Sequence, residues 1–403
     1  MGSLTSAESG IHSPVAEAFS LTHGGLFYRL QAALHMTREE RAWVALRALA
    51  AIVLTWLPLL LLSAAQGLAI GNRVRIPFLL DIAANVRFLI ALPLLILSEI
   101  GIDRRLREVV VHFVRSGLVP ERELPAFESV IERVVQLRDR VLPELVLLAL
   151  ALVPSISVRG RDFLVGNVST WQATPFDGGR ILSYAGWWFC LVSAPLFRFL
   201  VLRWLWTMAL WGGLLWRVSR LNLRLIPTHA DRTAGLGFLA EGQLKFSSIV
   251  FALSTVMAAQ AANALAYRGA TIGGLKYILL GYCVVVVAVL MAPLLVVIPT
   301  LVRVKKRGLF EYATLATAYS RKFHAKWVHT PHPPQEELLG SADIQSLSDI
   351  NGSYAIVRDM RVVPIDKATL AGLAVAALLP MVPLILMVTS AEELLKDVMH
   401  LLL

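Results

Sequence analysis

Residues 277–300 have the sequence Tyr277-Ile-Leu-Leu-Gly-Tyr-Cys-Val-Val-Val-Val-Ala-Val-Leu-Met-Ala-Pro-Leu-Leu-Val-Val-Ile-Pro-Thr300, without one charged side chain. A helix needs about 20 mainly apolar residues to cross a hydrocarbon core about 30 Å thick. This stretch is long enough, and stretches of similar composition recur before and after it. The sequence therefore predicts a chain that crosses a membrane several times.

The composition of the whole chain agrees with this prediction. The 403 residues are 57% hydrophobic and 16% charged, and the mean hydropathy is +0.66. Soluble domains carry about 25% charged residues, so the composition excludes an ordinary soluble protein, a fibre and a disordered regulator. The sequence has two cysteines, Cys190 and Cys283. This excludes a disulfide scaffold and a C-x-x-C metal or redox site.

Seven apolar runs of membrane-spanning length predict an all-α, polytopic transmembrane helical bundle. The candidate spans are residues 43–66, 77–100, 141–158, 181–206, 246–267, 275–302 and 368–390. The fourth run is ambiguous, because the chain stays apolar from Ile181 to Leu221 and has the length for two spans. Residues 197–203, where a turn would fall, hold no Gly, Asn or Asp. We therefore expect one helix that is kinked near Pro195 and continues into the cytoplasm.

Two charged segments outside the spans keep a helical pattern of apolar residues. One lies within residues 103–140 and includes Phe113, and the other lies within residues 308–328 and includes Phe323 and Trp327. Apolar stripes of this length need a packing partner. We expect the two stripes to pack against each other, so that amphipathic helices and long helix extensions form a cytoplasmic layer.

The spans divide the chain into four parts. They are a polar N-terminal leader (1–42), a bundle of the first six spans (43–302) with a cytoplasmic helical insert (103–140), a cytoplasmic segment (303–367), and the last span with a short amphipathic tail (368–403). The leader lacks the apolar core of a cleavable signal, and we expect it to be disordered or partly helical.

Basic residues give the predicted orientation. The net charge is +10, and basic clusters at residues 104–107 and 303–307 directly follow the second and sixth spans. Such clusters favour the cytoplasmic side, so we predict a cytoplasmic N-terminus and an external C-terminus. The positive charge is suited to anionic lipids of the bilayer. Nucleic acid is not an expected partner, because the chain has no soluble basic domain to hold it.

Polar residues within the spans form the first candidate site. Arg87 and Arg198 are predicted near mid-membrane, where a charge costs at least ~2.5–3.5 kcal/mol and faces a partner or water. The residues assigned to a permeation path for small anions are Asp81, Asn85, Arg87, Arg198, Arg203, Gln260 and Asn263. In the alternative, the charges are structural, for example a buried pair of Arg87 with Asp81 or with Glu99 of a neighbour that locks helices together, and the amides join neighbouring helices.

A row of residues along the fourth span forms a second candidate site. The row follows steps of three and four residues and so lies on one helix face; it consists of Arg203, Trp206, Leu210, Gly213, Arg217, Arg220 and Arg224. We expect Arg217, Arg220 and Arg224 either to bind anionic lipid headgroups or to line a cationic vestibule that gathers anions.

The loop Pro227-Thr-His-Ala-Asp-Arg-Thr-Ala-Gly-Leu-Gly-Phe238 is the third candidate site. His229, Asp231 and Arg232 form a candidate gating or regulatory loop, since histidine titrates near neutral pH. The alternatives are a structural loop in which Asp231 caps a turn, and an interfacial catalytic pair. No metal, nucleotide or hydrolase motif accompanies these residues, so we predict no metal, no cofactor and no enzymatic activity.

The same loop carries a resemblance. Together with Arg203-Trp204 and Trp206 before it, and with residues 339–347 and 357–364 after it, the loop resembles a family of uncharacterised bacterial multi-pass membrane proteins. The resemblance covers residues 45–366. It implies a location in the bacterial inner membrane. It implies no activity and assigns no role to any residue.

Two main functions follow as hypotheses. The first is a channel or channel-like permease, a homo-oligomer that passes a small ion or solute and favours small anions. The second is a membrane scaffold or sensor that transports nothing and binds partners through its cytoplasmic helices. An interfacial enzyme that uses His229 and Asp231 is a third, weaker hypothesis.

Overall fold

The computed structural model describes residues 12–25, 28–29, 41–156, 169–176, 179–329 and 341–387. Within these residues the chain is helical apart from one two-stranded antiparallel sheet. The elements are α1 (Pro14–Glu17), α3 (Arg41–Thr55), α4 (Leu57–Ala65), α5 (Ile82–Val86), α6 (Leu92–Arg115), α7 (Leu124–Arg138), α8 (Val141–Ile156), β1 (Ala173–Phe176), β2 (Gly179–Leu182), α10 (Tyr184–Trp188), α11 (Ala194–Val218), α12 (Phe238–Leu244), α13 (Ser247–Tyr267), α14 (Ile272–Leu295), α15 (Ile298–Phe323), α16 (Ala342–Arg358), α17 (Lys367–Leu378) and α18 (Val382–Leu386). The all-α fold class is confirmed.

Six helices of the described residues are long and apolar enough to cross a membrane. They are Ala42–Ala65, Ile82–Arg115, Tyr184–Val218, Phe238–Tyr267, Ile272–Leu295 and Lys367–Leu384. Helix α8 is equally apolar but has only 16 residues, and the last two residues of the predicted third span lie outside the described part of the chain. The chain is a multi-pass membrane protein, and its described residues contain six long candidate spans and one shorter apolar helix.

Residues 184–218 form one helix, so the ambiguous fourth run crosses the bundle once, as predicted. A π-turn, Phe189–Ser193, joins α10 to α11 directly before Pro195. Proline has no N–H to donate within a helix and its ring crowds the preceding turn, and a wider π-turn accommodates both effects. A second π-turn, Arg87–Ala91, joins α5 to α6 before Pro93 for the same reason.

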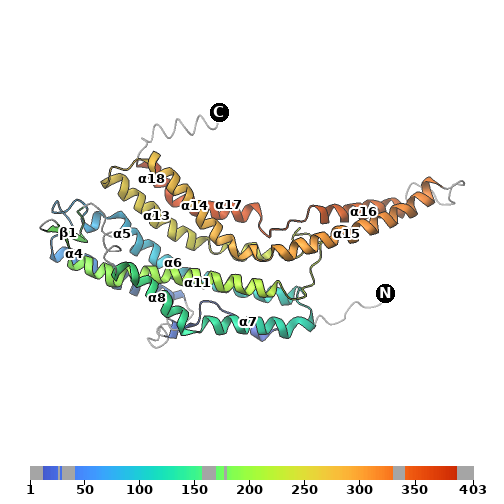
Figure 1. Ribbon diagram of the computed structural model, residues 1–403, viewed down its shortest axis with the longest axis horizontal. Helices are drawn as coiled ribbons and strands as arrows, with labels where there is room; N and C mark the ends of the chain where they lie inside the picture. The colour runs from blue at the N-terminus through green and yellow to red at the C-terminus, as the bar shows by residue number, and fades with distance from the viewer. Residues whose placement is uncertain are drawn as a thin grey trace.

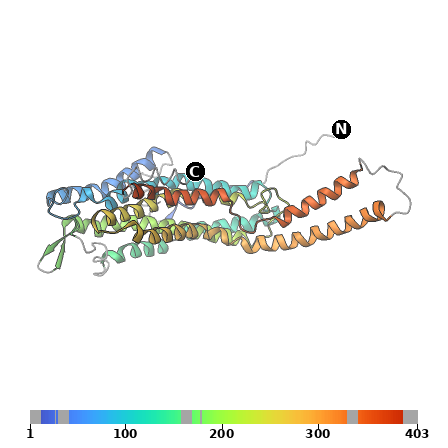
Figure 2. The ribbon, with the colours of Figure 1, turned by 90° about the horizontal axis from the view of Figure 1, so that it is seen from above.

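The helices lie lengthwise in one elongated bundle (Figure 1). We call the end that holds the β1–β2 sheet the hairpin end, and the end that holds α7 and the α15–α16 pair the arm end. In the view from above, α15 and α16 continue past the bundle as a two-helix arm (Figure 2). Helix α18 ends near the hairpin end, whereas α1 packs on α6 and α7 toward the arm end.

The arm corrects one sequence prediction. The stripe in residues 308–328 packs mainly on α16, and the Tyr319 hydroxyl and the Trp327 indole donate to Asp343 at 3.1 and 3.0 Å. The stripe in residues 103–140 has other partners, since the Phe113 ring packs on rings from α7 and α12. Each stripe is therefore covered separately. Helix α16 was not considered as the partner, although Ile344, Leu347, Ile350, Tyr354 and Val357 recur in it at helical spacing.

Residues 12–25, which we call the N-terminal segment, are built into the bundle. The segment contains the short helix α1, which agrees with the expected partly helical leader. Its burial was not predicted: Phe19 and Leu21 are 1% and 3% exposed. The segment therefore belongs to the core of the arm end.

Candidate functional site

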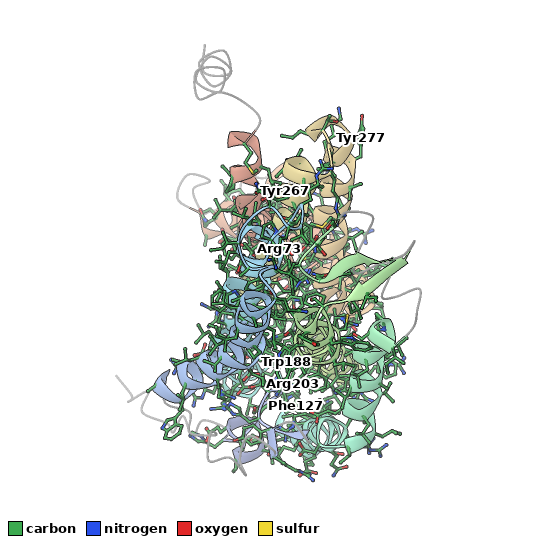
Figure 3. The ribbon with its side chains drawn as sticks, turned by 90° about the vertical axis from the view of Figure 1, so that its left-hand side faces the viewer. Arg73, Phe127, Trp188, Arg203, Tyr267 and Tyr277 are labelled. Atoms are coloured by element: carbon green, nitrogen blue, oxygen red, sulfur yellow. The ribbon has the colours of Figure 1, made fainter. Side chains whose placement is uncertain are left out.

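A cavity of about 390 Å³ lies toward the hairpin end of the bundle. Its lining residues come from the start of α5, from α13 and from the loops at that end: Ile76, Asp81, Ala83, Ala84, Arg87, Thr170, Gln172, Phe189, Gln260, Asn263 and Arg268. Figure 3 looks onto this end and labels Tyr267, whose hydroxyl donates to the Leu80 carbonyl at 3.2 Å. Four residues of the predicted permeation path, Asp81, Arg87, Gln260 and Asn263, share this cavity.

Asp81 organises one wall of the cavity. Its carboxylate caps α5 by accepting the Ala84 N–H at 3.0 Å, and it also accepts the Asn263 amide at 2.7 Å. The Trp171 indole donates to its second oxygen at 2.8 Å. Three donors from three segments therefore hold the carboxylate, which fixes the start of α5 against α13 and against the loop that carries Trp171.

That loop is fixed by close backbone contacts. The Trp171 N–H donates to the Ile76 carbonyl at 3.0 Å, and the Ser183 N–H donates to the Gln172 carbonyl at 3.0 Å. A Cβ atom at Gly186 would lie 2.0 Å from the same Gln172 oxygen. Glycine is therefore required at this position, because any side chain would push Gln172 away from α10 and change the cavity wall.

Arg87 lies in the π-turn between α5 and α6, and its guanidinium lines the cavity. The Phe189 and Phe197 rings lie 5.9 and 5.8 Å from it, within cation–π range. In the described part of the chain, no carboxylate lies within ion-pair distance of this guanidinium and no group hydrogen-bonds to it. A buried charge without a bonded partner is costly unless water or a ligand reaches it.

The depth of Arg87 differs from the prediction. The helix begins at Ile82 and not at residue 77, because Phe78–Leu80 form a separate 3₁₀ turn. Arg87 is therefore five residues, or about 7.5 Å, from the start of its helix. It lies nearer the hairpin end than the middle of the bundle.

Asn85 has a structural role next to the cavity and is not among its lining residues. Its amide donates to the carbonyls of Phe78, Leu79 and Asp81, and its oxygen accepts the Trp56 indole at 2.8 Å. The side chain thus closes the 3₁₀ turn and ties it to the α3–α4 region.

Arg198 lies far from the ends of its helix, and its hydrogen bonds are directed at α8. It donates to the Ala151 carbonyl at 2.7 Å and to the Ser155 hydroxyl at 2.8 Å. A third bond goes to the Ala194 carbonyl one turn back in its own helix. Arg198 is absent from the lining of the cavity. The sequence prediction put both arginines on one path; in the structure their charges interact, but Arg87 alone of the two lines the cavity.

Arg203 belongs to a buried charge cluster. It donates to Glu99 at 2.7 Å, and Arg47 donates to the other oxygen of the same carboxylate at 3.2 Å. Arg203 also donates to the Thr22 carbonyl of the N-terminal segment at 2.8 Å. We call Arg47, Glu99 and Arg203 the triad. The triad is a buried ionic lock between helices, as the alternative supposed, but Glu99 pairs in it with Arg47 and Arg203 and not with Arg87.

The N-terminal segment is held by further charged groups beside the triad. The Asp103 carboxylate accepts the Ser20 hydroxyl at 2.8 Å and the Leu21 and Thr22 N–H groups at 2.9 and 3.2 Å. Arg107 and Arg138 donate to backbone carbonyls of the same segment. The segment is therefore bound much as a peptide is bound in a polar groove.

The predicted row of arginines does not continue as one helix face. Helix α11 ends at Val218, so Arg220 and Arg224 lie beyond it. The Arg220 guanidinium stacks 4.1 Å from the Trp216 ring, and Arg217 donates to the Gly213 carbonyl. Because Arg203 at the other end of the row is in the triad, the row is broken at both ends.

The loop at 227–238 is held by Asp231. Its carboxylate accepts N–H groups from Thr233, Gly235 and Gly237 at 2.8 to 3.1 Å. Burial opposes ionisation, but these backbone N–H groups outweigh it and lower the pKa of Asp231 to about 2. His229 lies 2.9 Å from the same carboxylate.

Arg232 completes this loop in an unusual conformation. Its φ is +56°, a left-handed value that non-glycine residues seldom adopt. Its carbonyl accepts the Arg361 N–H at 2.7 Å, which ties the loop to the segment after α16. This geometry favours the structural interpretation of the loop. Within the described residues no group of three His, Cys, Asp or Glu side chains is placed to hold a metal ion.

Sequence reasoning missed several residues of the cavity. Thr170, Gln172 and Arg268 lie in connecting segments, and Phe189 lies in an apolar run where aromatic residues are common. The one available signal was proline: Pro93 and Pro195 follow the two π-turns, and such turns often mark functional sites. Compared with protein-family models, with curated proteins and with solved structures, the chain shows no match to any of them.

Proposed function

We propose that the protein is a membrane channel or permease for small anions, and that the cavity at Arg87 is the site where the anion binds. The observation that carries the proposal is the unpaired guanidinium of Arg87, which lines a cavity in the described part of a multi-pass membrane protein. The other two arginines of the predicted path have protein partners.

The charge of the cavity supports an anionic ligand. Arg87 and Arg268 contribute two positive charges, and Asp81 contributes one negative charge that is already hydrogen-bonded by three donors. A unit charge ~5 Å from an ion interacts with it by ~3 kcal/mol at an effective dielectric constant near 20. A fraction of that energy is enough to favour anions over cations several-fold.

The test is ion flux into liposomes that contain the purified protein. We expect the wild type to pass small anions such as nitrate or acetate under an imposed potential. Arg87→Gln should reduce this flux several-fold or weaken the discrimination against cations. The comparison variant is Arg198→Gln, which removes a charge that does not line the cavity and that is hydrogen-bonded to α8, so it should lower stability and change selectivity less than Arg87→Gln does. Wild-type liposomes that pass no anion would contradict the proposal.

A scaffold or sensor is the second candidate, and the arm is the observation that favours it. Helices α15 and α16 extend beyond the bundle (Figure 2), and Phe310 and Leu315 on α15 are 78% and 52% exposed. A photo-crosslinking side chain at Phe310 should capture one distinct partner under this hypothesis, whereas the same group at the buried Phe246 should capture none. Capture without any anion flux would favour the scaffold over the channel.

The partners and the location of the protein are part of the same proposal. Arg217 and Arg220, at the arm end of α11, are suited to anionic lipid headgroups. The homo-oligomer, the bacterial inner membrane and the cytoplasmic N-terminus stay predictions. A reporter that is active only outside the cytoplasm, fused after Leu403, tests the orientation.

A further inference from the structure

We infer that the ligand of the cavity at Arg87 is a small organic monocarboxylate and not a halide ion. This inference rests on the proposed function, because it names the substrate class of the same site. Three properties of the cavity carry it: its volume, its net charge, and the mixed character of its walls.

The volume is too large for a bare halide. The cavity holds about 390 Å³, whereas one water molecule occupies about 30 Å³ of the liquid. A single halide would leave space for on the order of ten waters, and these would screen it from Arg87. Cavities that bind organic molecules start at about 300 Å³. The volume therefore fits a short organic acid.

The charge fits a monoanion. Arg87 and Arg268 against Asp81 leave one net positive charge along the lining. A monocarboxylate balances that charge, whereas a phosphate dianion would leave one negative charge in excess close to Asp81. The Asp81 carboxylate accepts hydrogen bonds from Ala84, Trp171 and Asn263, so it would repel a second anionic group and has no donor to offer it.

The cavity walls offer a partner both for the carboxylate of such a ligand and for its apolar body. The planar guanidinium of Arg87 can donate two parallel N–H bonds to one carboxylate. The alkyl or aryl body would then face the apolar side chains of Ile76, Ala83, Ala84 and Phe189, which line the same cavity. A halide would use none of this apolar surface.

Calorimetric titration of the full-length protein in detergent tests the inference. The probes are butyrate and benzoate, with butyramide as the neutral isostere, chloride as the halide and methyl phosphate as the dianion. We expect both carboxylates to bind at least tenfold more tightly than butyramide, chloride or methyl phosphate. Arg87→Gln should abolish carboxylate binding. Arg87→Lys keeps the charge but not the planar fork, and should weaken binding about tenfold.

Two more variants separate a specific site from general loss of structure. Arg73→Gln removes an exposed arginine of the hairpin end that does not line the cavity, and it should bind benzoate as the wild type does. Ala83→Leu should reduce the volume of the cavity and weaken binding of benzoate more than binding of the smaller butyrate. Melting temperatures of all variants show whether each is folded.

The outcomes distinguish this inference from the proposed function. Chloride flux that depends on Arg87, with no carboxylate binding, would overturn the inference and keep the anion channel. Equal binding of butyrate and butyramide would also overturn it. Carboxylate binding that depends on Arg87, in a protein that passes no anion, would support the inference and contradict conduction.

Discussion

Arg87 of the cavity and Glu99 of the triad lie on the same long helix, Ile82–Arg115, and their buried charges are compensated in opposite ways. Arg87 and Glu99 are twelve residues apart, about 18 Å along the axis. At Arg87 the guanidinium faces two aromatic rings and a cavity, without a bonded partner in the described residues. At Glu99 one carboxylate is shared by Arg47 and Arg203 and is 5% exposed.

The difference shows what a buried arginine in a membrane helix can mean. A charge whose partners are all protein groups holds helices together, and its removal costs stability. A charge that faces a cavity contributes little to stability, but it can attract a ligand. Stability and binding, measured on the same variants, therefore separate the two roles.

The largest expected effect is at the triad. Glu99→Ala removes the carboxylate that two buried guanidinium groups share, and it should lower the free energy of unfolding by ~3–5 kcal/mol. Thermal denaturation in detergent measures this effect. The matched control is Glu108→Ala, whose carboxylate is 51% exposed and pairs only at the surface, so its effect should be under ~1 kcal/mol. Equal effects of the two variants would remove the distinction between the triad and an ordinary surface pair.

A somewhat smaller effect is expected beside the triad. Asp103→Ala removes three hydrogen bonds to the N-terminal segment and should cost ~2–3 kcal/mol, since bonds to charged groups are worth ~1.5–3 kcal/mol. Limited proteolysis should then cut within residues 12–25 more rapidly than in the wild type. An unchanged cleavage rate would show that the segment is held by its apolar side chains, Phe19 and Leu21.

Asp231 is a third kind of charged group, because its carboxylate is stabilised by backbone N–H groups and not by a charged side chain. Its pKa is about 2 in the folded protein and 3.8 in the ordinary case. The ionised form therefore stabilises the fold by about 2 kcal/mol above pH 4, and this contribution is lost as the pH falls from about 4 to 2. Asp231→Asn should flatten the stability profile in that window, whereas Asp359→Asn, at an exposed ion pair, should not. Identical profiles for wild type and Asp231→Asn would contradict this assignment.

The smallest effect on stability is expected at Arg87. Arg87→Gln should change the free energy of unfolding by less than ~1 kcal/mol or raise it, because it removes a buried charge that forms no ion pair or hydrogen bond with a described carboxylate. The same variant should show the largest change in anion flux. A loss of several kcal/mol would mean that Arg87 is a structural charge like Arg203, and the comparison would fail.

The spans could be predicted from the sequence because apolar length is a local property. The single crossing of residues 184–218 followed from the absence of turn residues, and Pro195 indicated where that helix deviates. The partner of Arg203 could not be predicted in this way. Glu99 was considered as a partner for Arg87, but which helix faces which is decided by packing between distant segments. Trp171, which fixes Asp81, lies in a loop whose position depends on Ser183 and Gly186.

Part of the cavity lining could also be predicted from local sequence. Asp81, Arg87, Gln260 and Asn263 are polar residues in apolar surroundings, which is a visible signal. Arg198 gives the same signal but points toward α8. Polar residues in membrane helices can therefore be found from the sequence, whereas the direction in which they point depends on the neighbouring helix.

The bond from Arg203 to the Thr22 carbonyl has a consequence for the order in which the protein assembles. It joins residues 181 positions apart in the chain, and synthesis proceeds at about 5–20 residues per second. Thr22 therefore leaves the ribosome on the order of ten seconds or more before its partner exists. The bonds of the N-terminal segment to Asp103 and Arg138 join residues only 81 to 118 positions apart, so the segment can dock on α6 and α7 first, and the bond to Arg203 then adds α11 to a part of the bundle that is already assembled.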